Sequence, residues 1–133
     1  MKILLQQARF HGPLPAHLRS KAPKGERADF LIEDGVLTKV GSGLKAPGAL
    51  VIQSKDLHLS RGFTDLYADF GSPGYENRET LESGSLAALA GGFTRVLLQP
   101  DTRPVLQSGG EVTALRLQSR GLPVEVCIAA ALT

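Results

Sequence analysis

The residues best placed to do chemistry lie in residues 62–74, which read GFTDLYADFGSPG. Residues 63–70 are predicted as a β-strand, and Tyr67 and Asp69 are separated by one residue, so their side chains share a face of that strand. A carboxylate with a second ligand beside it is the start of a metal site. A neutral phenol, however, is a poor zinc ligand, and one carboxylate does not hold a metal alone. The pair predicts no metal site of its own, with Asp69 as the one weak candidate ligand.

The three histidines are separated along the chain. His11 and His17 fall in residues 10–27, a basic segment rich in proline and glycine that is predicted as an exposed loop. We expect a solvated loop there rather than a phosphate or metal patch. His58, on a short predicted strand, is expected to be a half-buried structural residue rather than a ligand.

Composition excludes several functional classes. The 133 residues are 42% hydrophobic and 21% charged, as in an ordinary globular protein, and a net charge of +2 offers no strong field for nucleic acid or an anionic membrane. The opening MKILLQQARF is too short and too polar for a signal peptide or a membrane span. We therefore expect a cytoplasmic protein. Cys127, the single cysteine, is expected to be a buried, inert thiol, and Asp65 a buried, hydrogen-bonded structural carboxylate.

The front of the chain has the pattern of short strands. Asp34-Gly35 between two apolar runs is a two-residue hairpin signal. Residues 1–60 are therefore predicted to form a small β domain, with a hairpin over residues 29–40 and strands at residues 3–7, 50–53 and 57–59.

The second half alternates strands with helices. A helix at residues 79–90, with Asn77 as candidate cap and Gly91-Gly92 as its end, is expected to pack through Leu81, Ser85 and Ala88. Successive βα units imply parallel strands. The fold class is α/β, with strands at residues 63–70, 93–98 and 124–130 and helices at residues 79–90 and 110–120. The last strand is apolar throughout, so we expect a fragment of a longer fold or a second chain covering that edge.

Three ordered blocks resemble the signature of the dihydroorotases and related cyclic amidohydrolases. GFTDLYADFGSPG is similar to that family's G-F-I-D-x-H-x-H-x-R-x-P-G. ETLESGS with AGGFT is similar to E-T-x-x-S-G-x-x-A-A-x-x-G-G-x-T, and QPDTRPV to M-P-N-T-x-P. DFLIEDGVLTKVG and LHLSRGFTD also match the family's hairpin and its entry into the barrel, so the resemblance covers nearly the whole chain.

The resemblance implies a zinc-dependent (β/α)8 barrel, with a small β domain, residues 1–60, before the first three barrel strands in residues 61–133. It implies the reversible cyclisation of N-carbamoyl-aspartate to dihydroorotate by a metal-bound hydroxide, while an arginine and an asparagine hold the substrate carboxylate. The remaining metal ligands of the family lie beyond residue 133. No cofactor is therefore expected in this chain itself.

The chain departs from the family at four site positions. Tyr67 and Asp69 replace the two metal-binding histidines, Gly71 replaces the substrate-binding arginine, and Asp101 replaces the asparagine. A carboxylate at position 101 repels an anionic substrate, and glycine at 71 removes a bidentate contact. These are vestigial metal-site and substrate-site positions, and no catalytic residue is expected.

Two hypotheses remain open. The first is a non-catalytic homologue that acts as a structural or regulatory partner in pyrimidine biosynthesis, with aspartate transcarbamoylase as the expected partner and a homo-oligomer as a further expectation by analogy. The second is an active metal-dependent cyclic amidohydrolase at full length, acting on dihydroorotate or a related cyclic amide, with Asp69 assisting a metal held by later strands.

Overall fold

The computed structural model describes residues 1–23 and 25–132. The chain divides into two compact units, Met1–Arg61 and Gly62–Thr133, and each unit has its own cluster of buried hydrophobic side chains. Within the described residues, no helix has the length and apolar character needed to cross a membrane.

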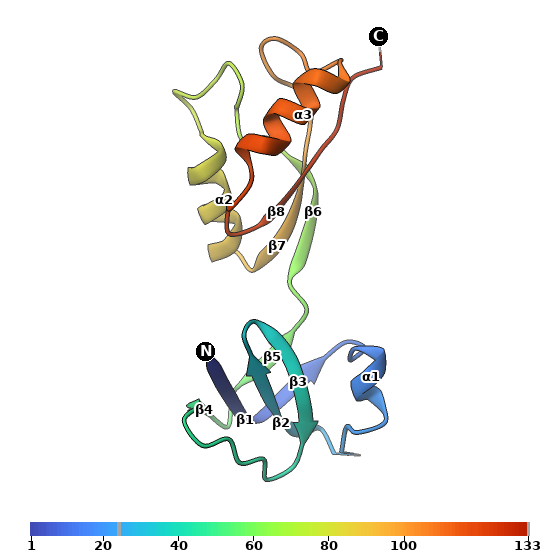
Figure 1. The fold of residues 1–133 in the computed structure, drawn as a ribbon, viewed down its shortest axis with the longest axis vertical. Helices are drawn as coiled ribbons and strands as arrows, with labels where there is room; N and C mark the ends of the chain where they lie inside the picture. Colours follow the sequence, from blue (N-terminus) through green and yellow to red (C-terminus); the bar gives the residue numbers. More distant parts are fainter. Residues whose placement is uncertain (24, 133) are drawn as a thin grey trace. The chain divides into compact units, whose positions relative to one another are not determined.

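The first unit is a five-stranded mixed sheet (Figure 1). Strands β3, β2, β1 and β4 lie in that order, and β5 pairs with the second half of β1. β1, β2 and β3 are antiparallel, whereas β4 and β5 both run parallel to β1. The bounds are β1 (Lys2–His11), β2 (Arg27–Glu33), β3 (Val36–Gly41), β4 (Leu50–Gln53) and β5 (His58–Ser60).

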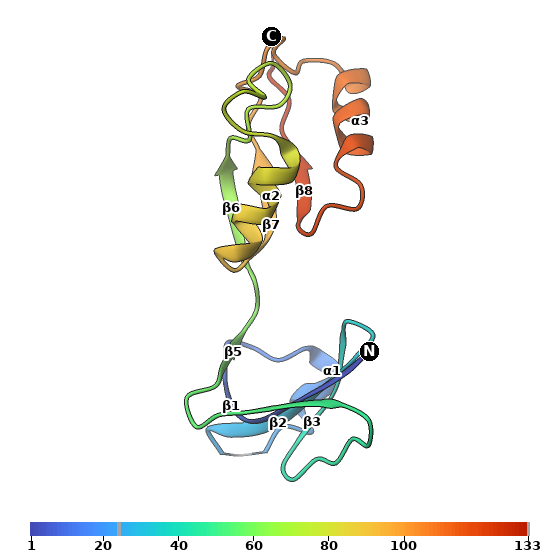
Figure 2. The ribbon, with the colours of Figure 1, turned by 90° about the vertical axis from the view of Figure 1, so that its left-hand side faces the viewer.

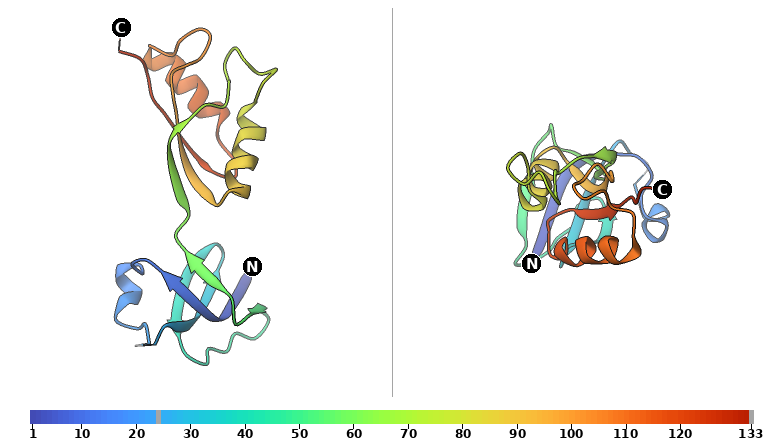
Figure 3. Two further views of the ribbon diagram at one scale, coloured as in Figure 1. Left: turned by 180° about the vertical axis from the view of Figure 1, so that it is seen from behind. Right: turned by 90° about the horizontal axis from the view of Figure 1, so that it is seen from above.

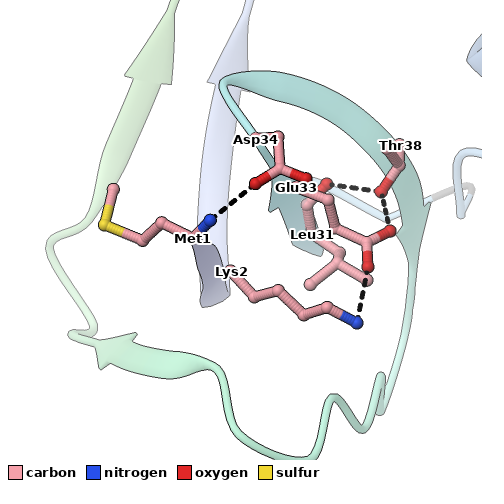
Figure 4. Close-up of polar contacts among 6 residues, drawn as sticks. All are labelled: Met1, Lys2, Leu31, Glu33, Asp34 and Thr38. Carbon is pink, nitrogen blue, oxygen red and sulfur yellow. Dashed lines mark hydrogen bonds and ion pairs between the residues drawn. The ribbon is translucent and has the colours of Figure 1, made fainter.

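The predicted hairpin is confirmed, because Asp34 and Gly35 join β2 to β3 with φ of 49° and 82°, the left-handed values that a tight two-residue turn requires. Figure 4 shows how polar contacts tie this hairpin to the start of β1. Lys2 Nζ lies 3.0 Å from Glu33 Oε1, and Thr38 Oγ1 donates to Glu33 Oε2 at 2.9 Å. The Lys2 and Thr38 bonds lower the pKa of Glu33 below its ordinary value.

The prediction of an exposed loop over residues 10–27 is wrong in part. β1 continues to His11, and a short helix, α1 (Ala16–Arg19), follows. Leu18 in that helix is fully buried in the same cluster as Phe30. A single apolar residue among prolines and basic residues has no periodicity, so the sequence pattern does not reveal that it anchors the segment.

The second unit is a three-stranded parallel sheet in the order β6, β7, β8, with two helices. Its elements are β6 (Phe63–Ala68), α2 (Leu81–Ala90), β7 (Phe93–Leu98), α3 (Gly109–Gln118) and β8 (Glu125–Ile128). In Figure 2, α2 crosses in front of β7 and α3 runs alongside β8, and the right-hand view of Figure 3 shows α3 beside β8 again. The α/β class and the parallel strands are as predicted, although β8 is shorter than predicted and only half-buried.

Helix α2 packs through a narrow face of small residues, as its sequence predicts. Ser85 is fully buried, and Leu81 and Ala88 pack against the cluster that contains Val96. A Cβ added to Gly84 would lie 2.5 Å from the Phe70 ring, so the absence of a side chain at position 84 allows α2 to approach this ring, which follows β6.

The predicted cap of α2 is wrong by three residues. Thr80, not Asn77, caps the helix, because its side chain accepts a hydrogen bond from Ser83 N while Ser83 Oγ accepts one from Thr80 N, both at 3.1 Å. At the other end, Gly92 has a φ of +81°, so the left-handed residue is the second glycine of the pair.

Candidate functional site

The strand β6, which contains Tyr67 and is followed by Asp69, is irregular next to these two vestigial metal-site positions. The pairing of β6 with β7 shifts register between Asp65 and Ala68. In this segment Asp65 Oδ1 accepts a hydrogen bond from Tyr67 N at 2.8 Å, and Asp65 itself is half-buried. The Tyr67 side chain does not fill a buried volume, because the residue is 71% exposed.

Asp69, the one weak candidate ligand, already has two partners in its own loop. Its Oδ1 accepts a hydrogen bond from Gly71 N at 3.0 Å, and its Oδ2 forms an ion pair with the Arg78 guanidinium. The Arg78 guanidinium also lies 5.5 Å from the centre of the Tyr75 ring, a cation–π distance. The carboxylate is therefore neutralised by a residue of the loop that follows β6.

These residues do not fit the zinc of the family. Zinc sites in proteins combine several His, Cys or carboxylate ligands, whereas Tyr67 offers only a phenol and Asp69 one carboxylate, whose charge is already paired with Arg78. Among the described residues no group of three or more His, Cys, Asp or Glu side chains could hold a metal ion.

Gly71 occupies a position that tolerates no other residue without backbone movement. Its φ is +71°, and an added Cβ would lie 2.9 Å from Tyr75 O and 3.1 Å from Glu79 O. Tyr75 N also donates to Gly71 O at 2.7 Å, so the loop closes tightly on this residue. A glycine has no side chain to make the bidentate contact that the resemblance assigns to an arginine at this position, and the tight loop leaves no space for one.

Asp101 lies in the loop after β7, next to the loop that contains Gly71. Its side chain is exposed. The two loops are bonded, because Arg103 N donates to Pro73 O at 2.9 Å and Gly74 packs so closely on Arg103 that a Cβ there would overlap its carbonyl. The substrate-site positions thus lie in neighbouring loops at the carboxyl ends of β6 and β7.

An open hollow of about 290 Å³ lies between the end of β6 and α2. Its polar lining is acidic, from Asp65, Asp69 and Glu79 beside the Tyr67 phenol, and the rest of it is apolar. Gly71 and Asp101 do not line it. The structure therefore brings Tyr67 and Asp69 together but places the two substrate-site positions outside. With Asp69 paired to Arg78, the Asp65 and Glu79 carboxylates still disfavour an anionic ligand in the hollow.

Two side-chain pairs were missed by the sequence analysis. Arg78 follows Asp69 by nine residues in a loop, and no spacing rule connects them. His11 and His58 lie in contact, with His11 Nε2 2.6 Å from His58 Nδ1. His58 is exposed, so its predicted half-burial is wrong. Alternation along two paired strands would have placed both histidines on one face, had the pairing been known.

Comparison with known proteins identifies the family. No family model matches the chain. It is 41% identical over 105 residues to a dihydroorotase of Chlorobaculum tepidum, covering 76% of this chain and 24% of that protein. It is 32% identical over 108 residues to a dihydroorotase of Lactococcus lactis subsp. lactis, covering 81% of this chain and 24% of that protein. The chain thus spans about a quarter of the length of these curated relatives.

Solved structures share the fold. The chain superposes on an L-hydantoinase (dihydropyrimidinase) from Arthrobacter aurescens with a TM-score of 0.75 at 19% identity, covering 96% of this chain and 27% of that one. A crystal structure of a dihydroorotase gives a TM-score of 0.59 at 18% identity, covering 97% of this chain and 30% of that one. The sequence relatives, together with this shared fold, show that the chain belongs to the dihydroorotase and cyclic amidohydrolase family.

Proposed function

We propose that the chain is the front part of a dihydroorotase-like protein that does not catalyse the family reaction and acts as a structural or regulatory partner in pyrimidine biosynthesis. The observation that supports this proposal best is that the Asp69 carboxylate is bonded within its own loop. Its two carboxylate oxygens are bonded to Gly71 N and to Arg78, within a loop that closes tightly around Gly71. A carboxylate whose charge is already compensated by an arginine of its own loop is a weaker metal ligand, because the ion must compete with that arginine.

The substrate side of the site supports the same proposal. Dihydroorotate carries a carboxylate, and the family's arginine and asparagine are replaced here by Gly71 and Asp101. In the separate hollow beside β6, the Asp65 and Glu79 carboxylates likewise disfavour an anionic ligand. Arg78, the cation beside Asp69, is already paired with that carboxylate.

In the proposed whole protein, β6, β7 and β8 are the first three strands of a (β/α)8 barrel, and α2 and α3 are its first two outer helices. The parallel order of the three strands and the amidohydrolase structures that share the fold support this arrangement. So does the half-burial of β8, because a strand next to a further barrel strand is buried more completely.

The proposed setting is the cytoplasm and the proposed partner is aspartate transcarbamoylase, with self-association as the competing mode of assembly. Co-purification of the transcarbamoylase with the full-length protein tests the partner. A full-length protein that associates only with itself would contradict it.

Catalysis is tested by measuring zinc content and dihydroorotate hydrolysis in the full-length protein supplied with zinc. We expect no turnover, and no zinc that depends on position 69. Asp69→Asn is compared with Asp56→Asn, an exposed aspartate of the first unit. Turnover that Asp69→Asn abolishes and Asp56→Asn preserves would overturn the proposal and favour the second hypothesis, an active cyclic amidohydrolase in which Asp69 assists a metal.

A further inference from the structure

The His11 and His58 side chains are brought together by strands that are far apart in the sequence. β5 pairs in parallel with the second half of β1, with Arg9 opposite His58 and His11 opposite Ser60, and the left-hand view of Figure 3 shows β5 beside β1. The two histidines are therefore diagonal neighbours on one face of the strand pair. His11 Nε2 lies 2.6 Å from His58 Nδ1, and the ring planes differ by only 9°.

This face of the strand pair is open to solvent. Phe10 and Leu59, which alternate with the histidines, pack against the buried cluster of the first unit on the opposite face. His11 and His58 are both exposed. An ion that approached the two ring nitrogens would keep water molecules in its remaining coordination positions.

The charged neighbours on the same face include two arginines. Arg9 lies opposite His58 on one side and Arg27 on the other, and its Nη2 forms an ion pair with Glu26 Oε2 at 2.5 Å. Arg27 Nη1 donates to Gln7 O at 2.8 Å. Glu26 thus compensates the charge of Arg9, the arginine paired with His58.

We propose that His11 and His58 form a two-histidine binding site for a borderline divalent transition-metal ion, of the class of Cu²⁺, Ni²⁺ and Zn²⁺. Neutral imidazole nitrogens are preferred ligands of these ions, and Cu²⁺ is bound most tightly in the series. The site lies in the β domain, is formed by other residues than Tyr67 and Asp69, and does not depend on whether the protein is catalytic.

The geometry requires little rearrangement. Zinc–nitrogen bonds of about 2.0–2.1 Å at a tetrahedral angle place two ligand nitrogens about 3.3 Å apart. The nitrogens now lie 2.6 Å apart, at hydrogen-bond distance, so an incoming ion replaces the proton between them. The nitrogens must then separate by well under the length of a bond while the rings tilt toward a common ion. Because the rings are exposed at the strand surface, no buried side chain opposes that movement.

The first test leaves the sequence unchanged. The full-length protein is treated with diethyl pyrocarbonate, with and without Cu²⁺, and the modification of each histidine is followed by mass spectrometry. We expect Cu²⁺ to slow modification of His11 and His58 several-fold and to leave His17 unaffected, because His17 lies on α1 with no contact to the pair among the described residues. Equal rates with and without Cu²⁺ at His11 and His58 would overturn the proposal.

Matched variants give the stoichiometry. His11→Ala and His58→Ala are each expected to bind one Cu²⁺ fewer per chain than the unaltered protein in calorimetric titration, whereas His17→Ala binds the same number. Loss of a Cu²⁺ in His17→Ala, or no loss in the first two variants, would contradict the assignment. Electron paramagnetic resonance of the bound Cu²⁺ should show two equatorial nitrogens, and a single nitrogen would also count against the pair.

Discussion

The Arg78 guanidinium forms an ion pair with the Asp69 carboxylate across the loop that follows β6. The charge of Asp69, the one weak candidate ligand, is thus compensated within the chain. The pair also links the loop that holds Gly71 to the residues just before α2. Asp69 therefore has a role in the local structure of this loop.

The Asp69–Arg78 pair is expected to add only a little stability. The two side chains are 38% and 57% exposed, so solvent screens the pair, and a double-mutant cycle with Asp69→Asn and Arg78→Ala should give a coupling of about 0.2–1 kcal/mol. Urea unfolding at low and high salt measures it, and high salt should reduce it. Arg120→Ala is the control, because its side chain has no hydrogen bond or ion pair among the described residues. A coupling that salt leaves unchanged would contradict this account.

Gly71→Ala is expected to destabilise the protein more than Gly121→Ala. Both glycines have a positive φ, +71° and +84°, so both substitutions carry the cost of a left-handed backbone, about 1–2 kcal/mol. Only at Gly71 does the new Cβ meet backbone oxygens, whereas nothing lies within 4 Å at Gly121. The difference between the two free energies of unfolding isolates the steric part. Equal losses of unfolding free energy in the two variants would show that the loop around Gly71 moves to accept the added methyl group at little cost.

The contribution of Glu33 to stability should be lost in acid. Its pKa is lowered in the folded chain, first by the hydrogen bond with Lys2 and then by that with Thr38. The folded state therefore favours the ionised carboxylate, so the stabilisation is present above the ordinary value of 4.5 and disappears as the pH falls through the lower folded pKa. Between about pH 6 and about pH 3, Glu33→Gln should lose less unfolding free energy than the unaltered protein. Lys2→Ala should also reduce the change in unfolding free energy over this pH range, because it removes the first of the two hydrogen bonds to Glu33. A change in unfolding free energy that matches the unaltered protein in both variants would contradict the role of Glu33.

Glu111 should make the start of α3 sensitive to acid. Its Oε2 accepts hydrogen bonds from Gln107 N at 3.1 Å, Ser108 Oγ at 2.8 Å and Ser108 N at 2.9 Å, and these bonds lower its pKa. Protonation weakens them, so the stabilisation is present above the ordinary pKa and is lost below the folded one.

Amide exchange at Val112 measures this effect, because Val112 N donates to Ser108 O in the first turn of α3. Its protection factor should fall in acid in the unaltered protein. Glu111→Gln retains a capping side chain without the charge, so its protection factor should change less between the same two pH values. If the protection factor of Val112 falls equally in both proteins, a group other than Glu111 causes the acid sensitivity of α3.

Features encoded over a few adjacent residues were predictable from the sequence. The Asp34-Gly35 turn, the apolar run that forms β7 and the small-residue face of α2 each depend on local chemistry, and the structure confirms all three. The cap of α2 was misplaced because Asn77 and Thr80 are both good cap residues. The choice between them is made by the reciprocal bond with Ser83, which the pattern alone does not decide.

Features that depend on distant pairing were not predictable. The contact between His11 and His58 requires β5 to pair with β1 across 47 residues of sequence, and no local signal specifies that register. The Asp69–Arg78 pair depends on the path of a loop, and the burial of Leu18 depends on the sheet beneath it. The four substituted family positions were evident from the sequence, but the bonds that Asp69 has acquired were not.

The hydrogen bond from Arg103 N to Pro73 O and the close packing of Gly74 on Arg103 join the loop that contains Gly71 to the loop that carries Asp101. An arginine placed at position 71 must displace the Tyr75 backbone, and the loop that moves is bonded to its neighbour. A substrate-binding pair at positions 71 and 101 therefore requires both loops to be rebuilt together, because neither can be altered alone.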